Sequence, residues 1–172
     1  MPKIIEHLPQ RLADEARRQT EEGGFSALTI RSVASACGVG VGTVYNYYPS
    51  KEALVATYLL EDWQTAMADL KAEASAVQKA EQVLLAICRM LRQYLDSHQP
   101  VFGDQGAAAG FTGAVGRYHS LLRSQLAEPI RPFCPDEFTA LFIAEALLTW
   151  TVAGTEANQL LRVLSPMLRK EN

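Results

Sequence analysis

Apolar residues recur at spacings of three and four positions through most of the chain, and this pattern predicts helices. The clearest case lies between residues 29 and 50. The first helix of the pair is predicted to bury the stripe formed by Ile30, Val33, Ala34 and Cys37. A second helix from about Val41 would turn Val44 and Tyr48 inward and leave Thr43, Asn46 and Tyr47 on its outer face.

Boundary signals frame both helices. Thr29 is suited to cap the first helix, and Gly38 stands where a left-handed residue would end it. Val39 would then pack back into the pair, Pro49 would stop the second helix, and Ser50 would cap the next. Any small helical hairpin has such a turn, but the joint occurrence of these signals favours a helix-turn-helix whose second helix can enter the major groove.

These residues resemble the amino-terminal domain of the TetR family of transcriptional repressors. The resemblance is carried over about thirty residues by Gly24, Phe25, Leu28, Thr29, Val33, Ala34, Gly38, Val39, Gly42, Thr43, Val44, Tyr45, Tyr47, Tyr48, Lys51 and Leu54. The chain departs from the family at Gln19 and Thr20, where members usually carry a bulky apolar pair. The rest resembles the family only in being helical and apolar.

The resemblance implies an all-α fold of two domains. Residues 1–50 would form a three-helix DNA-binding domain, and residues 51–172 a ligand-binding and dimerisation domain. The first helix is predicted over Pro2–Glu22, with Pro9 as an alternative start. A long helix over Ser50–Ala74 would belong to both domains, and further helices are expected over 78–97, 117–130 and from Asp136 onward.

The DNA contacts are predicted in two groups. The resemblance places Thr29, Thr43, Tyr45 and Lys51 on phosphates, where the backbone N–H groups near Val41 and Gly42 could also bind. Asn46 could pair with adenine and Val41 could touch a thymine methyl. The full set of predicted DNA-binding residues is Thr29, Arg31, Val41, Gly42, Thr43, Tyr45, Asn46, Tyr47 and Lys51.

The net charge of −3 restricts this hypothesis, because phosphate neutralisation supplies much of the affinity for DNA. Only the surface toward DNA must be positive, and its candidates are Lys3, Arg17, Arg18, Arg31 and Lys51. With so few, we expect a modest salt dependence per subunit and a need for dimerisation.

A ligand pocket is predicted in the second domain. Large apolar side chains with a few polar groups are typical of small-molecule sites. The candidates are Trp63, Met67, Cys88, Tyr94, Phe102, Phe111, Tyr118 and Trp150, with His98, His119 and Gln125 as polar contacts. Ordinary core packing is the alternative for each of them, and an apolar or aromatic inducer is expected.

A homodimer through the last two helices, Phe138 to Leu168, is expected. The first of them is apolar almost all round, so both sides must be covered. The last offers Leu160, Leu161, Leu164, Met167 and Leu168. The family's four-helix interface resembles this pattern, and a core within one chain is the alternative.

Other functions find little support. Three distant cysteines, Cys37, Cys88 and Cys134, fit a reducing compartment and buried packing, with a redox sensor as the alternative. A metal site from His98, Asp104 and His119 lacks ligand spacing, and no catalytic arrangement is legible, so neither cofactor nor enzyme activity is expected. The absence of a membrane-spanning run or signal peptide predicts a cytoplasmic protein. A helical dimeric interaction scaffold without an operator is the alternative function.

Overall fold

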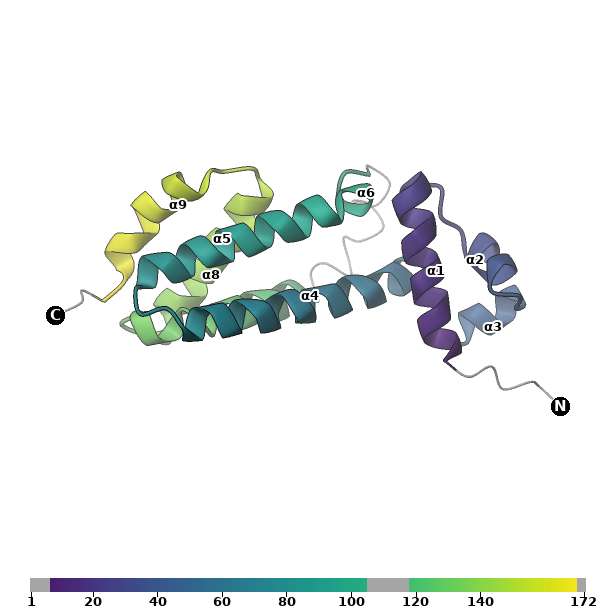
Figure 1. Ribbon diagram of the computed structural model, residues 1–172, viewed down its shortest axis with the longest axis horizontal. Coiled ribbons are helices and arrows are strands. Elements are labelled where there is room, and N and C mark those ends of the chain that lie inside the picture. The colour runs from purple at the N-terminus through teal and green to yellow at the C-terminus, as the bar shows by residue number, and fades with distance from the viewer. Residues whose placement is uncertain (1–6, 105–117, 170–172) are drawn as a thin grey trace. The chain divides into compact units, whose positions relative to one another are not determined.

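The computed structural model describes residues 7–104 and 118–169, and they are helical with no strand (Figure 1). The expected all-α fold is therefore confirmed. The chain forms two compact units: unit 1 runs to Asp62 and resumes from His98, while unit 2 contains residues 63–97 and the carboxy-terminal part. Among the residues described, no helix has both the length and the apolar character needed to cross a membrane.

Unit 1 contains α1 (Leu8–Gly23), α2 (Ile30–Ala36), α3 (Val41–Tyr45), the first half of α4 (Lys51–Ser75) and the short α6 (Gln99–Phe102). Its core is built from the residues that the apolar periodicity predicts, including Leu12, Phe25, Leu28, Val33, Val44, Leu54 and Tyr58. Helix α1 begins at Leu8, with Pro9 in its first turn, and not at Pro2. Proline lacks an N–H and fits the first turn of a helix, which is why it marks the start here.

The caps and the turn lie where they were predicted, but α3 ends at Tyr45 and not at the predicted stop, Pro49. The N–H groups of Tyr47 and Tyr48 both donate to the Val44 carbonyl, which closes the helix in a tight turn. The Thr29 hydroxyl accepts a hydrogen bond from the Ser32 N–H at 3.0 Å and completes a capping box on α2. Gly38 adopts a left-handed conformation (φ +70°), and the N–H of Val39 donates to the carbonyl of Ala34. Ser50 caps α4 by accepting from the Ala53 N–H. Local signals therefore fix the path of the chain from α2 to α4.

The polar pair at the end of α1 is accommodated by hydrogen bonds. Thr20 is buried, and its hydroxyl donates to the Ala16 carbonyl at 2.8 Å. Gln19 accepts from the Ser32 hydroxyl at 2.6 Å and donates to Glu15. The end of α1 is thus tied to the cap of α2 by polar contacts, where family members usually have apolar packing.

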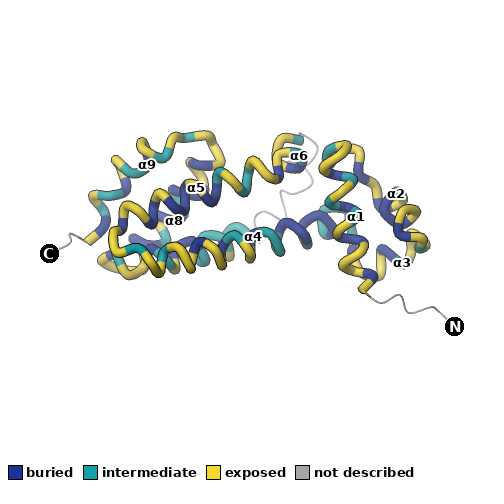
Figure 2. The backbone as a smooth tube through the Cα atoms, viewed as in Figure 1, coloured by how far each residue is buried: buried dark blue, intermediate teal, exposed yellow. Residues whose placement is uncertain are grey.

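Unit 2 contains the second half of α4, α5 (Ala80–Ser97), a helix described over residues 118–127, α8 (Glu137–Val152) and α9 (Ala157–Leu164). Helical turns η1 (Arg131–Phe133) and η2 (Ser165–Met167) flank the last two helices. Buried residues alternate with exposed ones along α5 (Figure 2), as its periodicity predicts. The helix α4 is shared by both units, as expected, whereas α6 was not foreseen.

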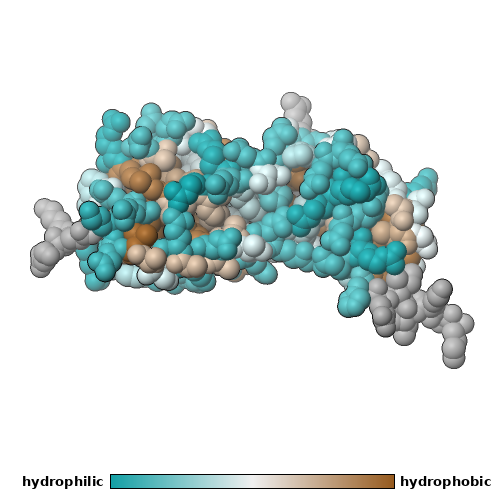
Figure 3. All heavy atoms as spheres, in the orientation of Figure 1, coloured by the Kyte–Doolittle hydropathy of each residue, from teal (hydrophilic) through white to brown (hydrophobic). Residues whose placement is uncertain are grey.

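The last two helices differ in how much of their apolar surface the chain covers. On α9 and η2, Leu160, Leu164 and Leu168 are buried in the core of unit 2, and Val163 remains exposed. The wide free face expected of the last helix is therefore largely covered within the chain. On α8, Phe138, Phe142, Trp150 and Val152 stay exposed. Apolar side chains are visible on the surface of this unit among polar ones (Figure 3).

Candidate nucleic-acid interface

The outer surface of α2 and α3 exposes side chains that the core of unit 1 does not need. Helix α3 is anchored from inside by buried Val44 and by Tyr48, whose hydroxyl donates to the Pro9 carbonyl at 3.1 Å. On the outside, Tyr45 is 52% exposed, Tyr47 50% and Val41 36%. Large side chains that gain nothing from burial in the chain are available to a partner.

An open groove of about 610 Å³ lies on this surface. Its lining residues come from the approach to α2, from α2 and α3, and from the start of α4: Ser26, Leu28, Thr29, Ile30, Arg31, Val41, Tyr45, Pro49, Ser50, Lys51 and Glu52. The groove brings together five of the predicted DNA-binding residues, Thr29, Arg31, Val41, Tyr45 and Lys51. The other four, Gly42, Thr43, Asn46 and Tyr47, do not line it.

Gly42 has no role in the chain's own packing that requires glycine. A Cβ built on it would meet nothing within 4 Å, and its φ lies outside the left-handed region. Glycine within a helix costs about 1 kcal/mol relative to alanine. Gly42 therefore weakens α3, and no packing contact among the described residues offsets this cost. It also leaves the backbone at the start of that helix without a side chain over it.

Lys51 is held at the groove by unit 1 itself. Its ammonium donates to the carbonyls of Phe25 and Leu28 at 3.2 and 3.4 Å and lies 4.2 Å from the centre of the Phe25 ring. These contacts orient the positive charge beside the groove that Lys51 lines. A cation that is already oriented loses less conformational entropy when it binds an anion.

The positive surface is smaller than the sequence suggests. Arg17 pairs with Asp62, and Arg18 pairs with Glu15 and Glu22, so these two charges are neutralised within the chain. The Arg18 guanidinium donates to both carboxylates, which raises its pKa further. Arg31 is exposed and makes no ion pair with the described residues, while Lys3 lies outside them. Arg31 and Lys51 are therefore the cations left among the predicted contacts.

A polar network joins α1, α4 and the start of α6 in unit 1. Asp62 accepts from Arg17 at 2.5 and 2.9 Å and lies 2.8 Å from His98 Nε2. Burial alone would raise the pKa of Asp62, but the hydrogen bonds from Arg17 and His98 outweigh it and lower that pKa. Nearby, the Ser26 hydroxyl and N–H both donate to Asp104. Sequence analysis missed this network, because its partners are far apart in the chain.

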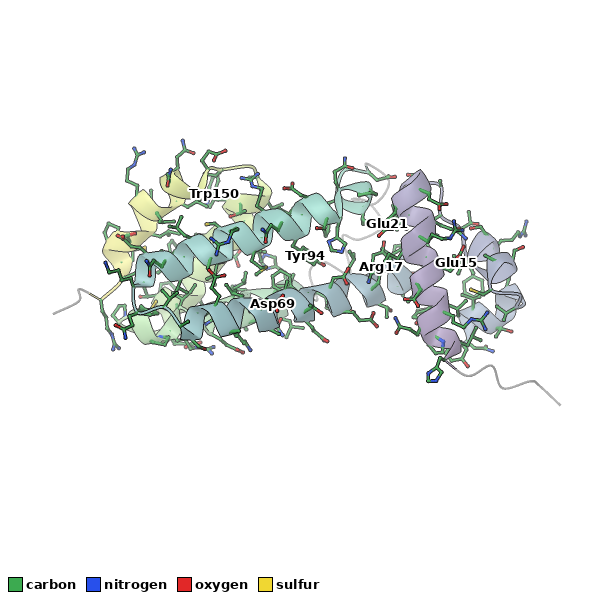
Figure 4. The ribbon with its side chains drawn as sticks, in the orientation of Figure 1. Glu15, Arg17, Glu21, Asp69, Tyr94 and Trp150 are labelled. Carbon is green, nitrogen blue, oxygen red and sulfur yellow. The ribbon has the colours of Figure 1, made fainter. Side chains whose placement is uncertain are left out.

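The predicted ligand residues fall into separate places. Trp63, Met67 and Cys88 are buried together in the core of unit 2, with Tyr94 partly buried against it. Tyr94 points from α5 toward α4 (Figure 4) and meets the Trp63 ring edge-on at 5.4 Å, while Trp63 Nε1 donates to Gln125 at 2.7 Å. The remaining four are not gathered there: Tyr118 is half-buried, Trp150 is 55% exposed, Phe102 belongs to unit 1, and Phe111 lies outside the described residues.

The cysteines and the proposed metal ligands are also placed. Cys37, Cys88 and Cys134 are buried, and burial raises the pKa of each thiol. A raised pKa disfavours the reactive thiolate. In residues 7–104 and 118–169, no three metal-ligating side chains come together, and His98 is occupied by Asp62.

Fold and surface together define a helix-turn-helix regulator, and the comparisons with known proteins name its family. Residues 12–58 match the sequence model described as "Bacterial regulatory proteins, tetR family". The helix-turn-helix domain of this chain is therefore that of the TetR family of transcriptional regulators.

Two curated relatives share the amino-terminal part. The transcriptional regulator UidR of Escherichia coli is 24% identical over 83 residues, which cover 48% of this chain and 42% of UidR. The transcriptional repressor KstR of Mycobacterium tuberculosis is 35% identical over 71 residues, or 41% of this chain and 31% of KstR. The matched region therefore spans less than half the length of either relative.

Two solved structures share the fold over nearly the whole chain. FadR of Thermus thermophilus, a TetR-family repressor in complex with lauroyl-CoA, is 19% identical with a TM-score of 0.66 and covers 95% of this chain and 97% of that one. RolR without ligand is 18% identical with a TM-score of 0.67 and covers 94% and 91%. At such identities the likeness concerns the fold alone.

Proposed function

We propose that this chain is a ligand-responsive transcriptional repressor, which binds a palindromic operator as a homodimer in the cytoplasm and is released by a small apolar or aromatic inducer. The observation that carries the DNA-binding part is the surface of α2 and α3. It combines exposed Val41, Tyr45 and Tyr47 with Gly42, a glycine that no packing contact among the described residues requires.

DNA would be held mainly through its backbone. Thr29, Thr43, Tyr45 and Lys51 are assigned to phosphates, and Gly42 allows the sugar-phosphate chain close to the start of α3. Asn46 and Val41, both exposed, are assigned to base edges. Arg31 is proposed to contact the DNA backbone or the edge of a DNA groove, and Tyr47 the backbone or a base. Two cations per subunit supply a small electrostatic contribution, so the affinity must come from two subunits binding together.

The dimer is proposed to form over the exposed side of α8. Phe138 is 76% exposed and its ring lies 6.3 Å from that of Phe142, which is also exposed. Apolar side chains gathered on one side of a helix favour a protein partner over water. A two-fold dimer would present two copies of α3 to successive major grooves.

The inducer is proposed to bind in unit 2, near Trp63, Tyr94 and Gln125. Two aromatic rings and one amide provide apolar area with a polar contact for orientation. Helix α4 belongs to both units, so a ligand that favours one of its poses would change the spacing of the two α3 helices. The release of DNA is then a population shift.

Operator binding can be tested by fluorescence anisotropy with a palindromic fragment from the protein's own promoter. Thr43→Ala combined with Tyr45→Ala should weaken binding at least about tenfold, because two phosphate contacts are lost. The matched control is Gln64→Ala with Gln93→Ala, which changes exposed residues of α4 and α5 and should leave the affinity unchanged. Equal binding by both double variants would contradict the assigned DNA surface. Absence of salt-dependent binding by the wild type would favour the interaction scaffold.

A further inference from the structure

One side of α8 carries a regular seam that residues 7–104 and 118–169 leave uncovered. Its opposite side is buried through Ala140, Ile143, Ala144, Leu147 and Leu148. The residues of the seam follow one another at alternating spacings of four and three, and we call Phe138, Phe142, Glu145, Thr149 and Val152 the outward seam. This spacing is typical of a helix that packs along another helix. The central position of the seam is a carboxylate, although its ends are apolar.

Glu145 is the centre of a cluster with both signs of charge. It accepts a hydrogen bond from Thr149 at 3.0 Å, and both Arg123 Nη1 and His119 Nε2 lie 3.4 Å from its oxygens. Each of the three side chains is a little over one-third exposed. Arg123 Nε is buried and has no hydrogen-bond partner among the described residues. The His119–Arg123–Glu145 cluster therefore keeps one N–H, that of Arg123 Nε, which no other described residue uses.

We propose that the His119–Arg123–Glu145 cluster sets the register in which the outward seam pairs with the same seam of a second copy. The proposal rests on the homodimer of the proposed function. Glu145 lies at the middle of α8 (Glu137–Val152). When two copies of a helix pair antiparallel about a two-fold axis, their middle residues meet at the axis.

The charges of the cluster are self-complementary about such an axis. Two Glu145 carboxylates brought together would repel, but each arrives with Arg123 and His119 as donors for its own and the facing carboxylate. A shifted pairing would instead set Glu145 against the Phe142 ring and bury an unpaired charge, which is costly. A polar group inside an apolar seam thus selects one register and one partner at some expense of affinity.

A double-mutant cycle measures whether the cluster becomes buried on self-association. In the full chain, Arg123→Met or Glu145→Leu alone removes one partner of the Arg123–Glu145 pair and leaves the other charge poorly compensated in the seam. The dimer dissociation constant from sedimentation equilibrium should then rise at least about tenfold. The combined variant removes both charges and should return to within about threefold of the wild type or bind more tightly. Glu145→Gln, which keeps the size of the side chain, should raise the dimer dissociation constant by a smaller factor than Glu145→Leu does.

The matched control is the pair Lys71 and Glu128, which lies in the same unit at 2.5 Å with both side chains about half exposed. Lys71→Met and Glu128→Leu, alone or together, should leave the dissociation constant within about twofold. Unaltered helical circular dichroism of each variant would show that the fold is kept.

The outcomes separate this proposal from the dimer itself. If the wild type is dimeric and all three cluster variants have the same dimer dissociation constant as the wild type, Glu145 stays in water. That result would overturn the role of the cluster in setting the register, but not the homodimer. A wild type that is monomeric at tens of micromolar would overturn the homodimer and this proposal with it. Loss of a fixed register should make the combined variant sediment as a mixture of dimers and larger species, and a single dimeric species would contradict register selection.

Discussion

Unit 1 and unit 2 are both helical, but they are held together differently and leave different surfaces uncovered. In unit 1, side chains cap helices and join them: Thr29 caps α2, Gln19 reaches its cap, and Asp62 joins α1 to α6. The uncovered surface of this unit is mixed, with tyrosine hydroxyls and open backbone beside Gly42.

Unit 2 depends chiefly on apolar packing along α5, α8 and α9. Its uncovered surface is the outward seam of α8, with phenylalanine near one end and valine at the other. The difference indicates two kinds of partner. A surface of hydroxyls and bare backbone suits a hydrated, charged polymer, whereas a regular apolar seam suits another helix. Function thus divides between the units in the same way as their chemistry.

The largest expected effect concerns the outward seam. Phe138→Ser with Phe142→Ser should raise the dimer dissociation constant at least about 100-fold, because aromatic side chains buried in an interface often contribute about 2 kcal/mol or more each. Operator affinity should fall with it, since one subunit offers few charges. Sedimentation equilibrium and anisotropy measure the two losses.

The control for this pair is Leu85→Ser, which removes an exposed apolar residue of α5 in the same unit. Its dissociation constant should stay within about twofold of the wild type, because single scattered apolar residues are ordinary surface. If Leu85→Ser and the phenylalanine variant behaved alike, the seam would not be the interface.

A smaller effect is expected from the polar network of unit 1. Asp62→Asn should lower the free energy of unfolding of this unit by about 2 kcal/mol near neutral pH, because it removes the charge that binds Arg17 and His98. Both tryptophans, Trp63 and Trp150, lie in unit 2. Their fluorescence should therefore show the transition of unit 2, and circular dichroism the earlier transition of unit 1.

The pH dependence of this difference follows from the lowered pKa of Asp62. A carboxylate whose pKa is lower in the folded state stabilises fully above the unfolded pKa of about 4, and less as the pH falls through the folded value. Wild type and Asp62→Asn should thus converge in acid. Glu22→Gln, in an exposed pair with Arg18, should cost less than about 0.5 kcal/mol at any pH. A difference that persisted in acid would contradict the role of the carboxylate.

The two units also differ in how far the sequence predicts them. Thr29, Gly38 and Ser50 act on residues within a few positions, so the helix-turn-helix could be derived from local rules. His98 and Asp62 are 36 positions apart in the chain, and no sequence pattern near either residue predicts their contact. Helix α6 was missed for the same reason, because its attachment to unit 1 depends on the Phe25 N–H donating to the distant Pro100 carbonyl.

Helix α8 shows a second limit. Its apolar residues lie all round, so periodicity cannot say which side faces the core. Trp150 was assigned to a ligand pocket on its size, and the fold leaves it more than half exposed. On α9 the leucines turn into the chain's own core. Which apolar face meets its own chain and which meets a partner depends on packing, not on composition.

The smallest expected effect distinguishes two glycines of the helix-turn-helix, Gly38 in the turn and Gly42 in α3. Gly42→Ala should stabilise unit 1 by about 0.5–1 kcal/mol, because alanine is the better helix former and its Cβ meets open space. Gly38→Ala also meets open space, but its left-handed backbone (φ +70°) should make that variant about 1 kcal/mol less stable. Denaturant unfolding followed by circular dichroism measures both.

Gly42→Ala should lower the affinity for the operator although it raises the stability of unit 1. If the sugar-phosphate chain approaches the start of α3 closely, the added methyl of Gly42→Ala should weaken binding about tenfold although the protein is more stable. Gly38→Ala should bind with nearly the wild-type affinity under conditions where it is folded. A more stable Gly42→Ala variant with unchanged operator affinity would mean that DNA does not come close to this backbone. Stability and affinity that diverge at Gly42 would show that glycine is kept there for the partner, and not for the fold.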